Sequence, residues 1–315
     1  MAKKYLITGG TGFLGRSLVK SLVEEGHSVT VLDNDSRGSI NKLAVSAKKI
    51  KFIKGDIRDI KTVKRACKNI DTVIHLAYIN GTENFYKRPD LVLDVAVKGM
   101  TNILDASIGE GVTEFFLASS SEVYNNPPRI PTPENVPLIV PDPLNPRYSY
   151  SGGKILCELM AIHNSKHFKK TVIFRPHNVY GPAMGFEHVI PQFIMRMKDL
   201  KKRKSNKISI QGSGKQSRSF IYIDDFTSAL MLLLKKAKNL EIYHIGTTKE
   251  ISIQELAFTI AGLFDMKVSI VPGPNAVGGP QRRCPDIAKI KSLGFLPKYS
   301  LEEGLIKTID WYKDQ

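Results

Sequence analysis

Short apolar runs alternate with amphipathic stretches through the first half of the chain. Segments such as Phe13–Glu25 and Leu91–Ile108 carry apolar residues at helical spacing. The runs between such segments have the length and composition of buried strands: Tyr5–Thr8, Ser28–Asp33, Ile50–Ile53, Thr72–Leu76 and Phe115–Ser119. This alternation predicts right-handed βαβ units, and therefore an α/β fold with a parallel sheet and helices on both faces. Two later runs, Thr171–Arg175 and Glu241–Ile245, extend the expected sheet.

The second half of the chain has more loops and fewer strand-like runs. Its expected elements are a proline-rich loop at 127–146, a helix at about Ser149–Asn164, a helix beyond Pro182, a strand at Lys207–Gln211, a helix at Asp224–Lys236 and two helices after about Ile251. No clean linker separates these pieces from the first half. We therefore expect a sheet domain (1–181 plus 220–246) interleaved with a smaller C-terminal lobe (182–219 and 247–315).

The composition is that of an ordinary globular protein. Of its 315 residues 42% are hydrophobic, and no stretch approaches the roughly eighteen apolar residues of a membrane helix. The first apolar run passes straight into a glycine turn, which predicts a strand and not a signal peptide. Cys67, Cys157 and Cys284 are widely spaced and form no metal-binding or CxxC pattern. We expect a cytoplasmic protein with reduced thiols, no bound metal and no membrane contact.

The net charge of +16, from 46 Lys and Arg against 30 Asp and Glu, raises the hypothesis of a nucleic-acid binder. The basic residues are, however, spread along the chain. The one dense run, Lys201–Lys204, is expected to cover a solvated helix end or loop. The charge therefore favours an anionic ligand, and we expect no nucleic-acid partner.

Three glycines follow the first strand and open the first helix, in the spacing G-x-x-G-x-x-G. Gly9 permits the tight turn, Gly12 lets the backbone approach a pyrophosphate, and Gly15 lets the helix pack close to the strand. In this strand–turn–helix context the motif predicts a Rossmann-type, doubly wound sheet that binds a dinucleotide. Asp33 ends the second strand, where a carboxylate accepts hydrogen bonds from ribose hydroxyls and repels a 2′-phosphate. NAD is therefore favoured over NADP, although Arg37 lies nearby.

The remaining cofactor contacts are expected at the glycine turn and at the carboxyl ends of the strands, where an open α/β sheet binds its ligands. They are Phe13, Leu14, Asn34, Asp56, Ile57, Leu76, Ala77, Tyr150 and Lys154. His75 ends the fourth strand and could act as a catalytic base. We favour a packed or backbone-bonded histidine there.

Tyr150 and Lys154 stand four residues apart, which places them on one face of a helix. A phenol is a poor base near neutrality, because its unperturbed pKa is about 10. A fixed cation nearby, helped by an oxidised nicotinamide, favours the phenolate. Tyr150 could then accept the proton of a sugar hydroxyl while hydride leaves for NAD. Ser120, after the preceding strand, could hydrogen-bond the reacting oxygen and shuttle its proton.

Together these motifs resemble the extended short-chain dehydrogenase/reductase family, specifically its NAD-dependent nucleotide-sugar epimerases, dehydratases and decarboxylases. The pieces appear in family order along nearly the whole chain: the glycine motif, Asp33, His75–Ala77, Ser119–Tyr124, Tyr150 with Lys154, Arg175–Pro182 and the segment around Arg218. The resemblance implies a catalytic set of Ser120, Tyr150 and Lys154. It also implies a homodimer built on two helices of each subunit.

The resemblance gives Ser121 and Glu122 positions that vary with the reaction. An acidic residue is common there in 4,6-dehydratases and decarboxylases, and often absent from 4-epimerases. Glu122 could therefore remove the C5 proton during dehydration or assist proton transfer after decarboxylation. The alternative is a carboxylate that caps or pairs structurally.

The same resemblance makes the smaller lobe a substrate-binding lobe. Asn178 is expected to contact the substrate diphosphate, and Arg218 to contact phosphate. Residues 280–287 resemble the C-terminal substrate segment of UDP-glucuronate decarboxylases, with Arg283 as a second phosphate or ribose contact. Tyr78 departs from the usual alanine and lies where the sugar could bind, so Tyr78 and Ser121 complete the expected substrate contacts. Ala96 and Asn125 are further departures from the family pattern.

The resemblance implies oxidation of the sugar at C4 with NAD, giving a 4-keto intermediate. That intermediate acidifies C5 or activates a C6 carboxylate for loss, so 4,6-dehydration or decarboxylation is slightly favoured by Glu122. Return of hydride to the other face would instead give 4-epimerisation. A non-catalytic NAD sensor or scaffold is a more distant hypothesis, because such proteins tend to lose the tyrosine or the lysine.

Overall fold

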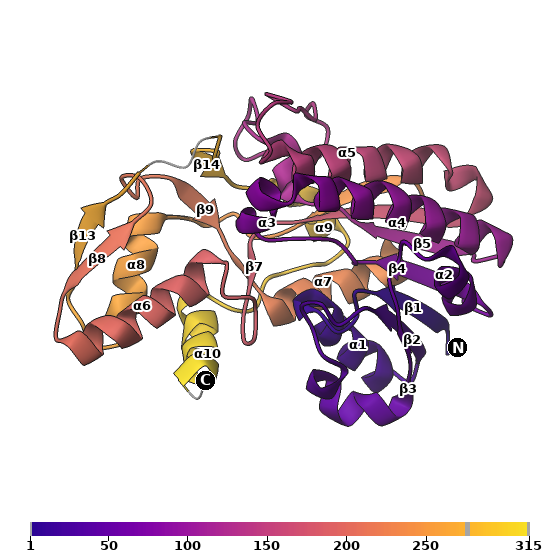
Figure 1. Ribbon diagram of the computed structural model, residues 1–315, viewed down its shortest axis with the longest axis horizontal. Coiled ribbons are helices and arrows are strands. Elements are labelled where there is room, and N and C mark those ends of the chain that lie inside the picture. The colour runs from indigo at the N-terminus through magenta and orange to yellow at the C-terminus, as the bar shows by residue number, and fades with distance from the viewer. Residues whose placement is uncertain (1, 275–277, 314–315) are drawn as a thin grey trace.

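Seven parallel strands form one sheet in the order β11-β6-β5-β4-β1-β2-β3. The computed structural model describes residues 2–274 and 278–313 of the chain (Figure 1). The strands are β1 (Lys4–Thr8), β2 (Ser28–Asp33), β3 (Ile50–Lys54), β4 (Thr72–His75), β5 (Glu114–Ala118), β6 (Lys170–Pro176) and β11 (Glu241–Ile245). The expected strands are all present. β1 pairs with both β2 and β4, so the strand order reverses at β1, which confirms the doubly wound Rossmann-type fold.

Helices cover both faces of this sheet, because successive strand residues point to opposite sides. Leu6 packs in a cluster with residues of α2, α4 and α5, whereas Ile7 packs with residues of α1 and α7. Burial on both faces explains why the strands read as continuous apolar runs. In Figure 1 α4 and α5 lie above the sheet, and α1 and α7 lie below it. The bounds are α1 (Phe13–Glu24), α2 (Ile60–Cys67), α4 (Pro89–Gly109), α5 (Tyr148–His163) and α7 (Ile223–Lys236).

The rest of the described chain forms a smaller body beside the sheet, at the left of Figure 1. Its helices are α6 (Val189–Arg203), α8 (Ile253–Gly262) and α10 (Leu301–Lys313), and its strands are β8 (Lys207–Ile210), β9 (Ser217–Ser219), β12 (Glu250–Ser252), β13 (Ser269–Pro272) and β14 (Arg282–Arg283). β8 pairs with β13, and β9 lies between β12 and β14. One apolar cluster runs from α1 and α7 into α6, α8 and α10. The two-lobe division of the chain stays a prediction.

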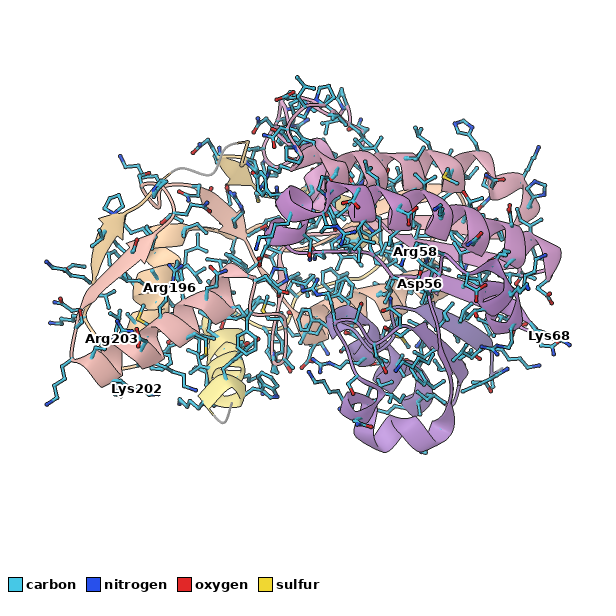
Figure 2. The ribbon with its side chains drawn as sticks, viewed as in Figure 1. Asp56, Arg58, Lys68, Arg196, Lys202 and Arg203 are labelled. Carbon is cyan, nitrogen blue, oxygen red and sulfur yellow. The ribbon has the colours of Figure 1, made fainter. Side chains whose placement is uncertain are left out.

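The remaining helices and strands are short. They are α3 (Thr82–Lys87), α9 (Ala288–Ser292), the pair β7 (Val179–Tyr180) and β10 (Ile221–Tyr222), and the 3₁₀ helices η1 (Ile40–Lys49), η2 (Ser121–Tyr124) and η3 (Ser165–His167). Lys202 and Arg203 of the basic run project at the outer end of α6 (Figure 2). Cations at a helix C-terminus complement its dipole, which fits the solvated helix end expected for this run.

No helix in residues 2–274 and 278–313 is long and apolar enough to cross a membrane.

A buried ion pair joins β6 to α5. Arg175 and Glu158 have side chains only 2% exposed, and they are linked by two hydrogen bonds, Nε to Oε1 at 2.8 Å and Nη2 to Oε2 at 2.6 Å. Arg175 also donates to the hydroxyl of Tyr124, at the end of η2, and to the carbonyl of Glu134 at 2.9 Å. The Tyr124 hydroxyl lies 2.6 Å from Nε2 of His244 on β11. The Arg175 guanidinium on β6 is thus bonded to α5, to the end of η2 and to the segment of Glu134, and Tyr124 extends the network to β11.

Replacing Glu158 by alanine should lower the free energy of unfolding by about 3–5 kcal/mol, because the Arg175 guanidinium would remain buried without its counter-charge. Urea unfolding followed by circular dichroism measures the change. Glu24→Ala serves as the control, since Glu24 pairs with Lys20 on the exposed face of α1 and should unfold close to the unaltered protein. Equal stability of the two variants would contradict the assignment of Arg175–Glu158 as the main tie between α5 and β6.

Candidate active site

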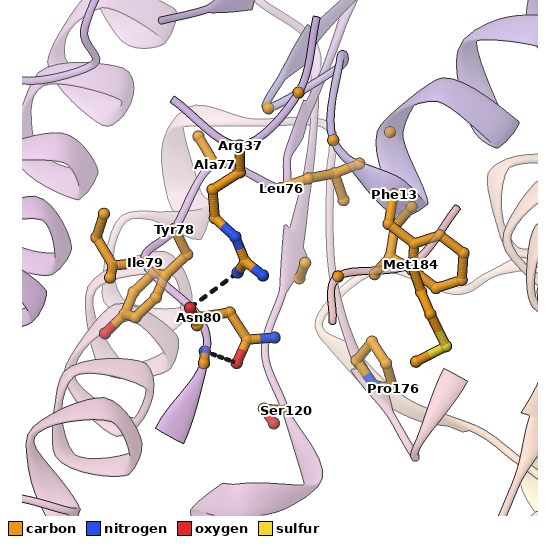
Figure 3. A pocket seen from close by; sticks show the side chains of 18 of the residues that line it. Phe13, Arg37, Leu76, Ala77, Tyr78, Ile79, Asn80, Ser120, Pro176 and Met184 are labelled. Carbon is orange, nitrogen blue, oxygen red and sulfur yellow. Dashed lines mark hydrogen bonds between the residues drawn. The ribbon is translucent and has the colours of Figure 1, made fainter. Parts of the chain in front are cut away.

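The carboxyl ends of the central strands open into a cavity of about 740 Å³. The cavity lies where the strand order reverses, which is the usual ligand position in an open α/β sheet. Its wall is formed by the glycine turn, the loops after β2, β3, β4 and β5, the start of α5 and residues 176–188 (Figure 3). Each residue predicted for the catalytic, cofactor and substrate contacts lines this cavity, with the exception of Arg218.

The glycine turn has the backbone that a bound pyrophosphate requires. Gly9 has a φ of +72°, and a Cβ there would lie 2.8 Å from the backbone nitrogen of Ala77. A Cβ on Gly15 would lie 2.2 Å from the carbonyl oxygen of Gly9, so the first turn of α1 packs directly on the loop. Gly12 is the N-cap of α1 and has no side chain to occupy the end of the helix dipole. The turn therefore fits a dinucleotide phosphate.

The carboxylate of Asp33 is held by backbone amides at the end of β2. Its two oxygens accept hydrogen bonds from the amides of Thr11 at 3.0 Å and Asp35 at 2.9 Å. Arg37 points elsewhere: it donates to the carbonyl of Asn80 at 2.8 Å (Figure 3). It also donates to Glu187 at 3.0 Å. A guanidinium held in this way is not directed at a ribose 2′-phosphate, so the arrangement favours NAD.

The loop after β3 carries its own ion pair. Asp56 accepts from Arg58 at 2.8 Å, and Arg58 also donates to Asp94 on α4 at 2.9 Å (Figure 2). The hydrogen bond from Arg58 lowers the pKa of Asp56, so this carboxylate is ionised. Its negative charge stands with that of Asp33 at one end of the cavity.

Tyr150 lies in the first turn of α5 with its ring stacked on Phe85 at 4.6 Å between centroids. It is only 7% exposed. Burial raises the pKa of Tyr150 to about 12, although a hydrogen bond with Ser120 acts in the opposite direction. The protein groups by themselves therefore hold the phenol protonated, contrary to the lowering expected from Lys154.

Lys154 is buried one turn further along α5. Its ammonium donates to the carbonyl of Ala118 at 2.8 Å and lies 6.0 Å from the centroid of the Tyr150 ring. Burial lowers the pKa of Lys154 to about 8.

His75 is a packed residue at the end of β4, as favoured from the sequence. Its Nδ1 lies 2.8 Å from the Thr8 hydroxyl, and burial lowers its pKa to about 3.

Glu122 forms ion pairs with two arginines. Arg283 donates to Oε1 at 2.6 Å, and Nη2 of Arg147 lies 3.6 Å from Oε2. Burial raises the pKa of Glu122, but the two guanidinium groups outweigh it and bring the pKa below its ordinary value. Nη2 of Arg283 and Nε of Arg147 are buried and have no hydrogen-bond partner among the residues that the structure describes. Unpaired buried donors of this kind favour an anionic ligand.

The other predicted substrate residues lie at different depths. Asn178 lines the cavity and donates to the carbonyl of Ser219 at 2.8 Å, and Ser121 lines it as a buried residue. Arg218 does not line the cavity, and its guanidinium donates to the carbonyls of Ser217 and Pro280 at 2.7 and 2.8 Å. Burial lowers the pKa of Arg218 to about 9, with neighbouring Arg283 adding to the effect.

Arg147 and the Arg37–Glu187 pair are site features that sequence reasoning missed or left open. Arg147 had one signal, its place three residues before Tyr150 on the loop that begins α5. No sequence pattern pointed to Glu187, because it lies 150 positions from Arg37 and meets it only in the folded chain.

Comparison with known proteins places these observations in a family. Residues 5–246 match the model of the NAD dependent epimerase/dehydratase family. The chain is 32% identical to a UDP-N-acetyl-alpha-D-glucosaminuronate decarboxylase of Bacillus cytotoxicus, covering 100% of this chain and 99% of that protein. It is 33% identical to the human dTDP-D-glucose 4,6-dehydratase, covering 99% and 91% of the two chains.

The solved structures that resemble this chain are nucleotide-sugar enzymes of the same kinds as these relatives. The UDP-glucose 4-epimerase of Thermotoga maritima, solved with UDP-glucose, has a TM-score of 0.87 and 29% identity over 99% of each chain. A dTDP-glucose 4,6-dehydratase double mutant of Streptomyces venezuelae, solved with NAD, has a TM-score of 0.88 and 26% identity over 98% of this chain and 97% of that one. The relatives thus carry out different net reactions on one fold.

Replacing Asp33 by asparagine should weaken NAD binding by about tenfold, because a charged acceptor for the ribose hydroxyls is lost. The gap between NAD and NADP affinity should narrow. Isothermal titration of both cofactors measures the two effects. Arg37→Gln is the control and should leave NADP affinity unchanged, since Arg37 is held by Asn80 and Glu187. An Arg37→Gln variant that loses NADP affinity would contradict this description of the pocket.

Proposed function

We propose that this chain, which belongs to the NAD-dependent epimerase/dehydratase family, removes the C6 carboxylate of a nucleotide-diphosphate uronic acid through a 4-keto intermediate. The observation that carries the proposal is the pairing of Arg283 and Arg147 with Glu122. Arg283 and Glu122 line the cavity together with Ser120 and Tyr150. Both arginines keep a buried nitrogen without a partner in the described chain. A carboxylate of the substrate would supply acceptors for these donors.

The first step is oxidation at C4 of the sugar. NAD, held by the glycine turn and Asp33, would accept the hydride and would return it in the last step. Tyr150 accepts the proton of the 4-hydroxyl, and Ser120 shares a hydrogen bond with the phenol and carries the proton between the two oxygens. Because burial alone keeps Tyr150 protonated, positive charge in the pocket has to favour its phenolate in the reacting complex. Lys154, Arg37 and Arg283 are the cations placed to do so.

The second step follows from the chemistry of the product of the first. A 4-keto uronate is a β-keto acid, so the electrons of the C5–C6 bond can move toward the 4-oxygen as carbon dioxide leaves. The resulting enolate then takes up a proton at C5 from water before the 4-keto group is reduced again. Arg283 and Arg147 would hold the carboxylate before it departs. Glu122 is held ionised, so we assign it the orientation of these arginines and not the donation of a proton.

Dehydration is less well supported than decarboxylation. Loss of a C6 hydroxyl needs an acid to protonate the leaving oxygen as well as a base at C5. Ser121 is a hydroxyl, and Glu122 is ionised between two arginines. Epimerisation at C4 is the second candidate, because a putative UDP-glucose 4-epimerase of Methanocaldococcus jannaschii is 32% identical over 98% of both chains. Epimerisation at C4 would need only the residues assigned to the first step.

A non-catalytic sensor or scaffold accords poorly with the site. Ser120, Tyr150 and Lys154 all line one cavity, and Tyr150 and Lys154 are buried there. A protein that only bound the cofactor would have no need for a buried ammonium, which costs free energy to desolvate.

Incubation of the protein with NAD and a panel of UDP-, GDP-, CDP- and dTDP-linked hexoses and uronic acids tests the proposal. Mass spectrometry should show loss of carbon dioxide from one uronic acid. Tyr150→Phe should abolish this turnover by at least about a thousandfold and still bind NAD, since the phenolic oxygen transfers the proton. Loss of water from a hexose, or an isomer detected by NMR with no change of mass, would replace decarboxylation by one of its alternatives. Full activity of Tyr150→Phe would overturn the mechanism.

We also propose a homodimer formed by α4 and α5. The two helices pack side by side and leave Leu93, Val97, Leu156 and Leu159 exposed on their outer faces (Figure 1). Apolar side chains gathered on neighbouring helices favour burial against a second copy.

Val97→Glu combined with Leu159→Glu should convert a dimer into a monomer, because the two charges would be buried at the interface. Light scattering after size-exclusion chromatography gives the mass directly. Phe258→Glu on α8 replaces an equally exposed apolar residue elsewhere and should remain dimeric. A monomeric unaltered protein would dismiss the proposal.

The cytoplasm is the proposed location. Cys67, Cys157 and Cys284 are free and buried, so none of them forms a disulfide. Free thiols are typical of reducing compartments.

A further inference from the structure

Tyr78 takes part in the packing of the catalytic helix. It follows β4 and lines the cavity, but its hydroxyl is directed at α5, where it donates to the backbone carbonyl of Tyr150 at 3.4 Å. The rings of Tyr78 and Tyr150 meet edge to face, with centroids 5.2 Å apart and planes at 84°. Figure 3 shows the Tyr78 side chain on the wall of the cavity next to the helices. The Tyr78 ring therefore borders the cavity, while its hydroxyl is hydrogen-bonded to the backbone of α5.

The face of the same ring covers Lys154. The ammonium lies 3.8 Å from the centroid of the Tyr78 ring, closer than its 6.0 Å to the ring of Tyr150. Lys154 is only 4% exposed, and the one hydrogen bond recorded for its ammonium within the described chain goes to Ala118. A desolvated ammonium is stabilised strongly by an aromatic face. Tyr78 thus replaces water that the ammonium has lost.

Small residues on the neighbouring helices make room for this ring. A Cβ added to Gly153 would lie 2.2 Å from the Tyr78 hydroxyl and 3.0 Å from the Cβ of Ala96. Ala96 lies on α4 and Gly153 on α5, so both helices are shaped around Tyr78. A larger side chain at position 153 would collide with Tyr78, so the packing of α4 and α5 accommodates this ring.

We propose that Tyr78 is a positioning residue for the oxidation step, whose ring face keeps the Lys154 ammonium charged and in place and whose edge-to-face contact orients the ring of Tyr150. The proposal rests on the proposed function for the identity of that step. Its geometry belongs to this chain, because an alanine at position 78 would offer neither a face nor an edge.

The other groups around Lys154 supply little fixed charge. His75 on β4 is neutral, because burial lowers its pKa to about 3. Burial raises the pKa of Cys157 to about 11, so its thiol is neutral as well. The carboxylate of Glu158 is occupied by Arg175. Since burial lowers the pKa of Lys154 to about 8, a modest loss of stabilisation would discharge it near neutral pH.

Tyr78→Phe and Tyr78→Met separate the ring face from the hydroxyl. The phenylalanine variant keeps the face and loses only the long hydrogen bond to Tyr150, so its pH profile of kcat/KM should match that of the unaltered enzyme. The methionine variant fills similar space without a π face. Its activity should fall about tenfold or more at pH 8, and the alkaline limb of its profile should move toward acid by about one pH unit. Tyr78→Leu provides a second variant without a ring, and thermal unfolding confirms that each variant is folded.

Ionisation of Tyr150 gives a readout that needs no substrate. Absorbance at 295 nm is titrated for each NAD-loaded variant against the same variant carrying Tyr150→Phe, so that the difference belongs to Tyr150. Loss of the ring at position 78 should move this ionisation toward alkaline pH, because Lys154 then loses its charge earlier. Methionine and leucine variants that titrate like Tyr78→Phe would overturn the proposal. An unaltered enzyme that turns over no nucleotide sugar would overturn the proposed function alone, and the absorbance titration would still decide the role of Tyr78.

Discussion

The buried guanidinium of Arg175 is the constraint on which the geometry of the active site depends. It joins β6 to Glu158 on α5, to Tyr124 at the end of η2 and to the carbonyl of Glu134. α5 carries Tyr150 and Lys154, and the segment that ends at Tyr124 carries Ser120 and Glu122. A charge so deeply buried is tolerated only while its partners stay in place. The ion pair therefore couples the positions of the catalytic groups to the integrity of the sheet.

Burial in this pocket acts against the ionic forms that the chemistry uses. It raises the pKa of Tyr150 to about 12 and lowers the pKa of Lys154 to about 8. Contacts that compensate for lost water accordingly surround both residues: Ser120 at the phenol, and Ala118 with the ring of Tyr78 at the ammonium. A site of this kind is sensitive to small changes in packing, because a lost contact shifts the pKa of Tyr150 or of Lys154, and the pKa of Lys154 lies near neutral pH.

Charged residues of both signs line the cavity. Asp33 and Asp56 line the part of the cavity that fits the ribose of a dinucleotide, and Arg283 lines it beside Glu122, which Arg147 also contacts. Arg283 thus offers a positive charge to a negatively charged substrate. Gly12, the N-cap of α1, has no side chain, so the first backbone amides of α1 are free to meet phosphate.

By itself the sequence determined the parallel sheet, the glycine turn, Asp33 and the pair Tyr150–Lys154, because each depends on neighbours within one strand, turn or helix. It did not reveal the two-residue strands β7, β10 and β14, which are too short to carry a periodic pattern. The tertiary structure alone decided that Arg283 meets Glu122 from 161 positions away and that Arg218 turns toward backbone carbonyls. It alone placed the ring of Tyr78 on Lys154. These contacts join segments that only folding brings together, and burial, which sets their strength, is a property of the packed molecule.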